Sequence, residues 1–334
     1  MKSPFTNGEV RTERKSRSLY YRKESFTIVY HVYVCEDTGE EFTTDELDAL
    51  NIRQVHHKYR EKYGIPFQDE IRQIREQYGL SAAKMSEVLG LGVNVYRQYE
   101  AGEMPSVATG RLIRLAGDPA EFEKLLELNK NALEEQDYLK IKKKVAQANS
   151  GESIVEGLLK HWLLGNHYPS IQNGYRMPDL ARIGNMIRYF AYHVSPFTTA
   201  LNKLMFYADF GHFKKYGTAI SGLRYKAIQH GPVPENYGGI YNQVANEGYV
   251  SVEEIPFENF VGDRFIASTI DPEFFESFFS PSELEMLQNV VQRFKDKTTK
   301  QIVHISHEEP AWKDNVDDHQ RISFEYGFEL RNID

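Results

Sequence analysis

The sequence predicts an α+β protein that is mostly helical, and three observations support this fold class. β-branched and aromatic residues are concentrated early, between Ser16 and Cys35, which is typical of short antiparallel strands. From Phe67 onward, short helical patterns alternate with glycines,. Beyond residue 154, apolar and aromatic residues recur at helical spacing, interrupted by a few strand-like runs,.

The chain of 334 residues is longer than one hydrophobic core usually organises, so we expect separate domains. The patterns predict a small β-rich module with one helix over 1–65 and a five-helix domain over 66–130. A solvated helix and linker are expected over 131–153, followed by a largely helical domain over 154–334.

Composition excludes several classes of protein. No apolar run is long enough to cross a bilayer, and the N-terminus lacks the apolar region of a signal peptide,. A single cysteine cannot form an internal disulfide, so we expect a cytoplasmic protein without membrane contact. The net charge of -8 argues against a protein that coats nucleic acid non-specifically.

The N-terminal module is expected to contain two or three short antiparallel strands between Ser16 and Cys35,. Thr43-Thr44-Asp45-Glu46 then predicts the capped start of a helix,. This helix should reach about Tyr63 and end at Gly64-Ile65-Pro66.

Three short helices follow. Ile71, Ile74 and Tyr78 give the first helix one apolar face, which closes at Gly79,. Ser81 is the expected N-cap of the second helix, over 82–89,.

The third helix is expected from about Gly92 to Ala101, with Val93, Tyr96 and either Tyr99 or Glu100 pointing inward,. This arrangement leaves three polar side chains on the opposite face: Asn94, Arg97 and Gln98.

Two helices joined by a tight corner can place a recognition helix in the major groove of DNA. Asn and Gln can pair with adenine, and Arg can pair with guanine. We therefore predict DNA contacts by five residues: Ser81, Lys84, Asn94, Arg97 and Gln98. The alternative is a purely structural helical bundle.

The stretch from Leu80 to Ser106 resembles the XRE-type helix-turn-helix of MqsA-like antitoxins, most specifically in Gly92-Val-Asn94 and Tyr99-Glu-Ala-Gly102. The resemblance implies that Asn94 and Gln98 face the bases. The family usually has Arg where Gln98 stands, so a different operator sequence is expected. We expect Glu100 to stabilise the fold, for example by pairing with Arg75.

MqsA-like proteins usually carry a zinc ribbon with two Cys-x-x-Cys pairs before this domain. The framework here resembles that ribbon, with Ser3 and Thr6 in place of the first pair and Cys35 and Thr38 in place of the second. Hydroxyls are poor zinc ligands, so we predict a ribbon-like fold without metal. His31, His56 and His57 are the remaining candidate ligands.

The region from Arg176 to Trp312 resembles the Panacea domain, also called SocA-like. The resemblance rests on three segments: Leu201–Asp209 with Phe213–Gly217, Tyr225–Pro234, and His304–Trp312. It singles out eleven residues as structural or toxin-contacting: Lys203, Tyr207, Asp209, Tyr216, Gly217, His230, Gly231, Pro232, His307, Glu308 and Trp312.

Within this region we expect helices over 180–192, 201–213 and 282–295, the last following Ser280-Pro281,. Strands are expected over 219–229, 265–269 and 322–330. The apolar residues of 201–213 should form core, with Lys203 and Asp209 at the helix surface or end,. His230-Gly231-Pro232 predicts a turn,.

The sequence offers little support for an enzyme. His230, Asp209, His304, His307 and Glu308 could in principle build an acid-base or metal site,. However, their spacing matches no hydrolase or metallopeptidase motif, and the chain has no P-loop and no dinucleotide fingerprint,. We therefore expect neither catalysis nor a cofactor.

These resemblances imply a type II antitoxin. The C-terminal domain would neutralise a cognate toxin by direct binding, and the helix-turn-helix would bind operator DNA and repress the antitoxin's own operon, with homodimerisation through the N-terminal half. One alternative is a repressor whose C-terminal domain senses a ligand or another protein. A second alternative is that DNA binding has been lost. It is supported by the balanced charge of residues 67–116, which carry six basic and six acidic side chains, whereas DNA-binding domains are usually basic.

Overall fold

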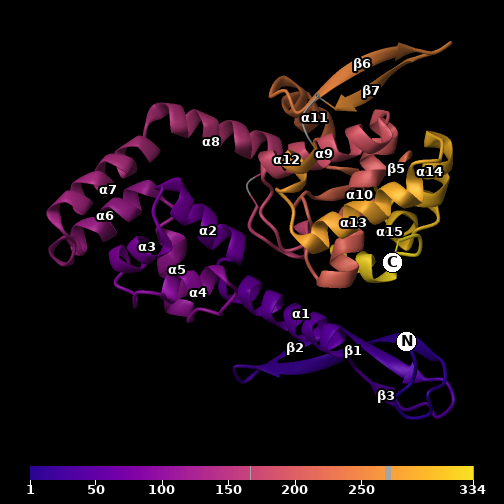
Figure 1. The fold of residues 1–334 in the computed structure, drawn as a ribbon, viewed down its shortest axis with the longest axis horizontal. Helices are drawn as coiled ribbons and strands as arrows, with labels where there is room; N and C mark the ends of the chain where they lie inside the picture. The colour runs from indigo at the N-terminus through magenta and orange to yellow at the C-terminus, as the bar shows by residue number, and fades with distance from the viewer. Residues whose placement is uncertain (166, 268–271, 334) are drawn as a thin grey trace. The chain divides into compact units, whose positions relative to one another are not determined.

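The computed structural model describes residues 1–165, 167–267 and 272–333 (Figure 1). Helices predominate over strands in these residues, which confirms the expected mostly helical α+β class. The chain forms two compact units, one of Met1–Pro66 with Pro105–Arg111 and the other of Phe67–Met104 with Leu112–Asp334. Among the described helices, none has the length and apolar character needed to span a membrane.

The first unit is built on a long β-hairpin rather than on the short strands expected. β1 (Val10–Tyr21) pairs antiparallel with β2 (Glu24–Cys35), and β3 (Glu41–Phe42) adds a short third strand. Arg22 and Lys23 connect β1 and β2 with φ angles of 46° and 70°, the left-handed conformation that a two-residue hairpin turn requires.

Helix α1 (Asp45–Tyr63) begins and ends where the sequence predicts, with Thr44 accepting a hydrogen bond from the Leu47 amide. The helix covers β2 through two side-chain amides. Asn51 donates to the His31 carbonyl at 2.9 Å and accepts from the His31 amide at 2.8 Å. Gln54 makes the same pair of bonds to Val29. These bonds satisfy backbone groups of β2 that no strand pairs.

In the second unit, five helices lie before the C-terminal region: α2 (Gln68–Gln77), α3 (Ala82–Val88), α4 (Val95–Glu100), α6 (Pro119–Leu128) and α7 (Glu135–Ala148). A further helix, α5 (Val107–Leu115), belongs to the first unit up to Arg111 and to the second from Leu112. Ile71, Met85 and Tyr96 are buried in their shared core. Tyr78 stacks on Phe122 with ring centroids 4.0 Å apart.

Two predictions for this part of the chain are wrong. The third helix begins at Val95 rather than near Gly92, so Val93 is exposed and does not point inward. The segment expected to be solvated contains α7, and one face of α7 packs into the core through Tyr138, Ile141 and Val145.

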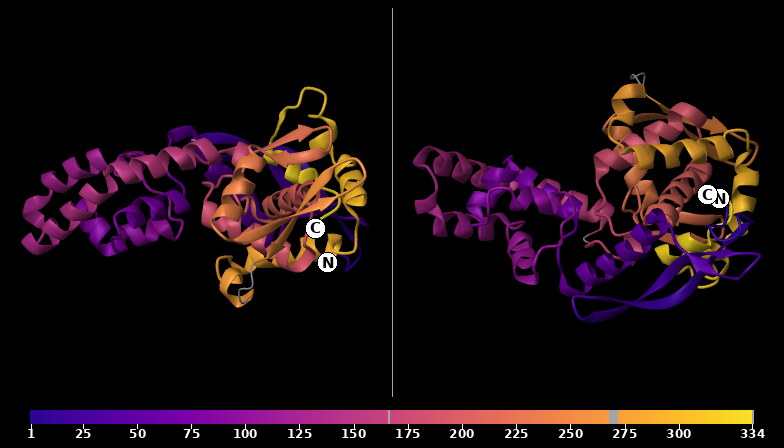
Figure 2. Two further views of the ribbon diagram at one scale, coloured as in Figure 1. Left: turned by 90° about the horizontal axis from the view of Figure 1, so that it is seen from above. Right: turned by 60° about the horizontal axis from the view of Figure 1, so that its bottom comes forward.

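Helix α10 (Thr198–Tyr216) lies at the centre of the C-terminal region, with α9 (Leu180–Val194), α13 (Pro281–Phe294) and α14 (Thr299–His307) packed around it (Figures 1 and 2). All residues of α10 from Ala200 to Phe213 are buried. The capped start of α13 confirms the prediction from Ser280-Pro281.

The strands of this region form two small antiparallel sheets. One has the order β5-β4-β8 and the other is a hairpin of β6 and β7. The strand bounds are β4 (Tyr225–Ile228), β5 (Gly231–Pro234), β6 (Val250–Pro256), β7 (Val261–Ala267) and β8 (Arg321–Ile322). The remaining elements are α8 (Gly151–Leu164), η1 (Lys130–Ala132), η2 (Ile171–Asn173), α11 (Tyr237–Asn246), α12 (Pro272–Glu276), α15 (Pro310–Lys313) and η3 (Phe324–Glu329).

The strand predictions hold only in part. β4 lies within 219–229, and β7 includes residues 265–267 of the second predicted strand, whose residues 268 and 269 lie outside the described part of the chain. The expected strand over 322–330 is a strand for its first residue only. It continues as the 3-10 helix η3, whose Phe324 stacks on Phe210 at 4.2 Å.

Candidate DNA-binding and partner-binding sites

The predicted recognition helix presents three unengaged polar side chains. Asn94, Arg97 and Gln98 are all exposed. Within the described residues, no hydrogen bond or ion pair engages any of these side chains, and Asn94 is the N-cap of α4 without forming a side-chain cap bond. The geometry therefore leaves these three groups available to an external ligand, and their contact with DNA stays a prediction.

Two hydrogen bonds set the position of this helix on its neighbours. The Ser86 hydroxyl accepts from the Tyr96 amide at 3.1 Å, and the buried Tyr96 hydroxyl donates to the Ile71 carbonyl at 2.7 Å. The expected pair between Arg75 and Glu100 is confirmed, with Nε and Oε1 2.5 Å apart. Glu100 therefore stabilises the fold, as expected.

The other two predicted DNA contacts have structural partners. Ser81 accepts a hydrogen bond from the Lys84 amide at 3.2 Å and so caps α3. The Lys84 ammonium pairs with Glu87 at 2.6 Å and with Asp137 of α7 at 2.7 Å. A phosphate would have to compete with two carboxylates for Lys84, so we expect a smaller contribution from it than from Asn94, Arg97 and Gln98.

The four residues that stand in place of the zinc-ribbon cysteines come together around one thiol. Cys35 and Ser3 are buried, and the Thr6 hydroxyl lies 3.5 Å from the Cys35 sulfur. Hydrogen bonds from the hydroxyls of Ser3, Thr38 and Thr6 lower the pKa of Cys35 to about 6.

One thiol and three hydroxyls do not fit zinc, which requires four good ligands. Among the described residues, no cluster of three or more His, Cys, Asp or Glu side chains is placed to hold a metal. His31 and His57 are buried, and Asn51 of α1 contacts the backbone of His31.

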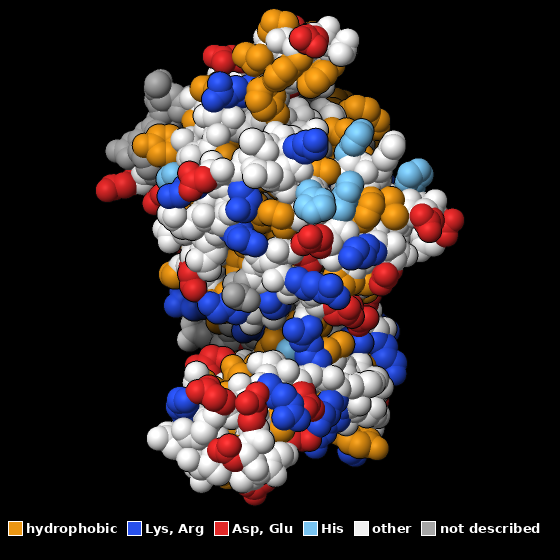
Figure 3. Space-filling model, turned by 90° about the vertical axis from the view of Figure 1, so that its right-hand side faces the viewer, with side chains coloured by type: hydrophobic (Ala, Val, Ile, Leu, Met, Phe, Trp, Pro, Cys, Tyr) orange, Lys and Arg blue, Asp and Glu red, His pale blue; other side chains and the backbone are white. Residues whose placement is uncertain are grey.

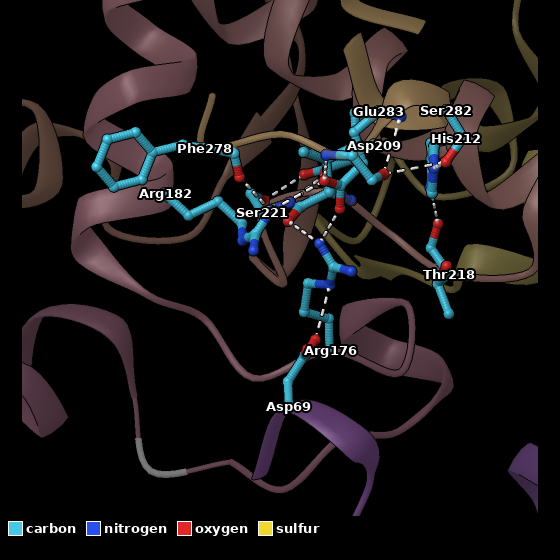
Figure 4. Close-up of polar contacts among 12 residues, drawn as sticks. Asp69, Arg176, Arg182, Asp209, His212, Thr218, Ser221, Phe278, Ser282 and Glu283 are labelled. Atoms are coloured by element: carbon cyan, nitrogen blue, oxygen red, sulfur yellow. Dashed lines mark hydrogen bonds and ion pairs between the residues drawn. The ribbon is translucent and has the colours of Figure 1, made fainter. Parts of the chain in front are cut away.

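In the C-terminal region, Asp209 is fully buried, which corrects the expectation that it lies at a helix surface or end. Its Oδ1 accepts from the amides of Ile220 and Ser221 at 2.8 and 2.7 Å. Its Oδ2 accepts from the Ser221 hydroxyl (Figure 4) and, at 2.7 Å, from the Tyr225 hydroxyl. Burial raises the pKa of Asp209 although these hydrogen bonds oppose the rise. Asp209 thus joins α10 to the loop that leads into β4.

Lys203 is also buried rather than at the surface. Its ammonium donates to the Pro232 carbonyl at 3.1 Å, and burial lowers its pKa to about 7. A Cβ on Gly231, which has φ +99°, would lie 2.5 Å from Lys203 Cε and 2.6 Å from the Ser306 hydroxyl. Only glycine fits this position, because both the conformation and the space exclude a side chain.

Other signature residues lie at or near the ends of helices and strands. The His307 and Trp312 rings stack with centroids 3.8 Å apart, and the Trp312 indole donates to the Ile228 carbonyl at 2.8 Å. His230 is exposed in the predicted turn between β4 and β5. Gly217 ends α10 with φ +69°, and the Tyr216 hydroxyl donates to Glu285 at 3.4 Å.

Glu308 is exposed, whereas its neighbour Glu309, which the sequence did not single out, is fully buried. Glu309 accepts hydrogen bonds from the Tyr207 hydroxyl at 3.3 Å and from the Arg331 and Asn332 amides at 3.0 and 3.2 Å. It therefore connects α10 to the C-terminal tail. The signal that could have identified it is the Pro310 that follows it, because proline favours the first position of a helix.

A further network that the sequence did not reveal is centred on Arg176 (Figure 4). Arg176 pairs with Asp69 of α2 at 3.2 Å and with Glu283 of α13. Arg182 binds the other oxygen of Glu283 at 3.0 Å. Burial would raise the pKa of Glu283, but the two arginine charges outweigh burial and lower the pKa to about 2. The network links the first helix of the helix-turn-helix to the C-terminal region.

Two segments of the chain match known families. Residues 201–313 match the family described as antitoxin SocA-like, Panacea domain, and residues 71–116 match a helix-turn-helix family. No curated protein and no solved structure matches the chain. The two matches confirm the expected Panacea and helix-turn-helix resemblances, whereas the MqsA-like ribbon stays a prediction. The chain therefore contains a helix-turn-helix over residues 71–116 and an antitoxin-type Panacea domain over residues 201–313.

Proposed function

We propose that this protein is an antitoxin that neutralises a cognate toxin by direct binding through residues 154–334 and represses its own operon through residues 66–130. The match of residues 201–313 to an antitoxin domain carries the first part of the proposal. The unengaged Asn94, Arg97 and Gln98 support the second part. Neither matched family is an enzyme family.

The first prediction is that Asn94→Ala with Gln98→Ala abolishes binding to operator DNA and leaves toxin neutralisation intact. Each lost base contact should cost about 1 to 3 kcal/mol, so the double variant should bind at least roughly thirtyfold more weakly, enough to remove the gel shift. Gel shift with DNA from upstream of the gene measures binding. Growth of cells that co-express the product of the adjacent gene measures neutralisation.

A matched control is Asn289→Ala with Gln292→Ala, which removes the same residue types from the exposed face of α13. This control should retain the wild-type gel shift. Loss of both activities in the Asn94 and Gln98 variant would contradict separable functions. If the adjacent gene product is not toxic but the gel shift is present, the protein is a repressor without a toxin partner.

We further propose that the protein is a homodimer, since operators are commonly read as two half-sites about 34 to 36 Å apart. Support comes from α8, which directly follows the N-terminal half. Val155, Leu158, Leu159 and Trp162 are 66%, 62%, 46% and 69% exposed. Their spacing of three and four residues places them on one helix face. An exposed apolar stripe of this kind typically marks a protein interface.

The second prediction is that Leu158→Glu with Trp162→Glu converts the dimer to a monomer, because two charges would enter the apolar centre of the contact. Multi-angle light scattering should show the mass of one chain, and the gel shift should weaken. Leu128→Glu with Leu139→Glu, at two other exposed leucines, should leave the mass unchanged. A monomeric wild type, or a dimer in the α8 variant, would rule out this contact.

For residues 1–65 we propose a ribbon related to the MqsA-like zinc module, in which hydrogen bonds replace the metal. The convergence of Ser3, Thr6, Cys35 and Thr38 supports this relationship, since these are the positions at which a ribbon carries its ligands.

A further inference from the structure

A pocket of about 840 Å³ opens in the C-terminal region. The β6–β7 hairpin lines one wall, and the start of α10 with the preceding residues 194–197 lines another. Residues 295–302, from the end of α13 into α14, complete it. The signature residues of the Panacea resemblance do not line this pocket, so it is separate from the contacts described above.

Aromatic rings extend from the interior of this pocket to its outer edge. Phe197 contacts Phe257 with ring centroids 5.6 Å apart, and Phe257 stacks on Phe260 at 4.7 Å with an angle of 16° between the rings. Phe260 is 63% exposed and its neighbour Val261 is 60% exposed. These large apolar side chains are in contact with water. Covering them with a partner would lower the free energy of the system.

The charged side chains that line the pocket are mostly positive. Arg264, Lys295, Lys297 and Lys300 face it, against one acid, Asp263. Within the described residues, none of these four cations forms an ion pair. By contrast, Arg176, Arg182, Lys215 and Arg321 of the same region are each paired with a carboxylate.

This local excess of positive charge occurs in a chain with a net charge of -8. Glu258 and Asp296 are close in sequence but do not line the pocket. A row of unpaired cations beside an apolar surface is complementary to a partner that carries acidic groups next to an apolar side chain.

The observations favour a protein segment over a small ligand. A small-molecule site encloses most of its ligand, whereas the outermost rings here stand on the hairpin at the surface. Figure 3 shows hydrophobic side chains gathered at the top of the view, with both basic and acidic side chains beside them. This pattern of aromatic centre and charged rim is characteristic of protein interfaces.

We propose that this pocket is the docking site for the partner toxin, which inserts an aromatic or aliphatic side chain against Phe257 and Phe260 and sets adjacent acidic residues against the four cations. This inference rests on the proposed antitoxin function and assigns a surface and a partner chemistry to it. The acidic rim contacts would accelerate association and make binding sensitive to salt.

The test uses the full-length protein in two assays. In the first, fluorescence anisotropy measures binding of a labelled twelve-residue peptide of glutamates with two central phenylalanines. One double variant, Lys295→Glu combined with Lys300→Glu, reverses two charges of the pocket. Its control, Lys140→Glu combined with Lys143→Glu, reverses two exposed charges on α7. Phe260→Ser tests the apolar part, with Leu128→Ser as its control. The second assay measures growth with the co-expressed toxin.

We expect the Lys295 and Lys300 variant and the Phe260 variant each to weaken peptide binding about tenfold or more and to reduce neutralisation, whereas both controls behave as wild type. A peptide with lysine in place of glutamate should not bind. Equal peptide binding by all variants, or displacement of the peptide by ATP, would overturn the proposal. If the wild type neutralises and the pocket variants neutralise equally well, the docking site is wrong while the antitoxin function stands. If the wild type binds the peptide but neutralises nothing, the antitoxin function fails instead.

Discussion

Replacing Asp209 with alanine is expected to lower the free energy of unfolding by about 3 to 5 kcal/mol. The carboxylate is fully buried and accepts four hydrogen bonds, so its removal leaves two backbone amides and two hydroxyls without their acceptor. Urea denaturation of the full chain, followed by circular dichroism, measures the change.

Asp209→Asn distinguishes the loss of these bonds from a general intolerance of substitution. The asparagine oxygen can still accept from the amides of Ile220 and Ser221, and its NH2 group can donate to the hydroxyls of Ser221 and Tyr225 after they rotate. We expect this variant to cost less than half as much as the alanine variant. Asp317→Ala, at an exposed aspartate, should change stability by less than about 0.5 kcal/mol. Equal losses in the Asn and Ala variants would contradict this account.

Replacing Glu283 with glutamine should lower stability by about 3 kcal/mol at neutral pH and remove part of the acid sensitivity of the protein. The pKa of Glu283 is lowered from 4.5 to about 2 in the folded chain. Its charge therefore stabilises the fold above pH 4.5, and this contribution disappears as the pH falls from 4.5 to 2.

The difference in unfolding free energy between wild type and Glu283→Gln should accordingly be constant above about pH 5 and shrink toward pH 2. Glu285→Gln is the matched control on the same helix, since the Glu285 side chain is 50% exposed and pairs with Lys215 at the surface. This control should change stability by less than about 1 kcal/mol. A difference that stays constant down to pH 2 would show that Glu283 does not stabilise the protein through its charge.

Local sequence signals predicted the elements and several of their ends. Thr44, Ser81 and Ser280 each cap the helix they were expected to cap. The pairing of Arg75 with Glu100 was also expected, because an acidic side chain beside a DNA-facing helix should pair with a basic side chain rather than contact anionic DNA. Capping and helical spacing depend on residues a few positions apart, which is why they can be recognised without the structure.

The long-range polar contacts could not be predicted in this way. Arg176 and Glu283 are 107 positions apart, and no local pattern indicates that they meet. Lys203 and Asp209 looked like surface residues because charged side chains usually are. They are buried because β4, β5 and the loop before them supply the carbonyl, amides and hydroxyls that satisfy them.

The tail shows how packing can override a local pattern. Ile322–Leu330 alternates like a strand, but Phe324 and Phe328 pack against Phe210 and Phe213 of α10. These contacts join η3 to a helix more than a hundred positions earlier in the chain, so the alternation within the tail does not reveal them.

The burial of α10 on every side also affects the thermodynamics of association. One wall of the pocket is the start of this helix, whose middle is held by Asp209 and Lys203. A wall fixed before the partner arrives loses little conformational entropy on binding, so more of the contact free energy appears as affinity. The β6–β7 hairpin carries Phe260 and Val261, so covering this wall is the step that removes exposed apolar surface from water.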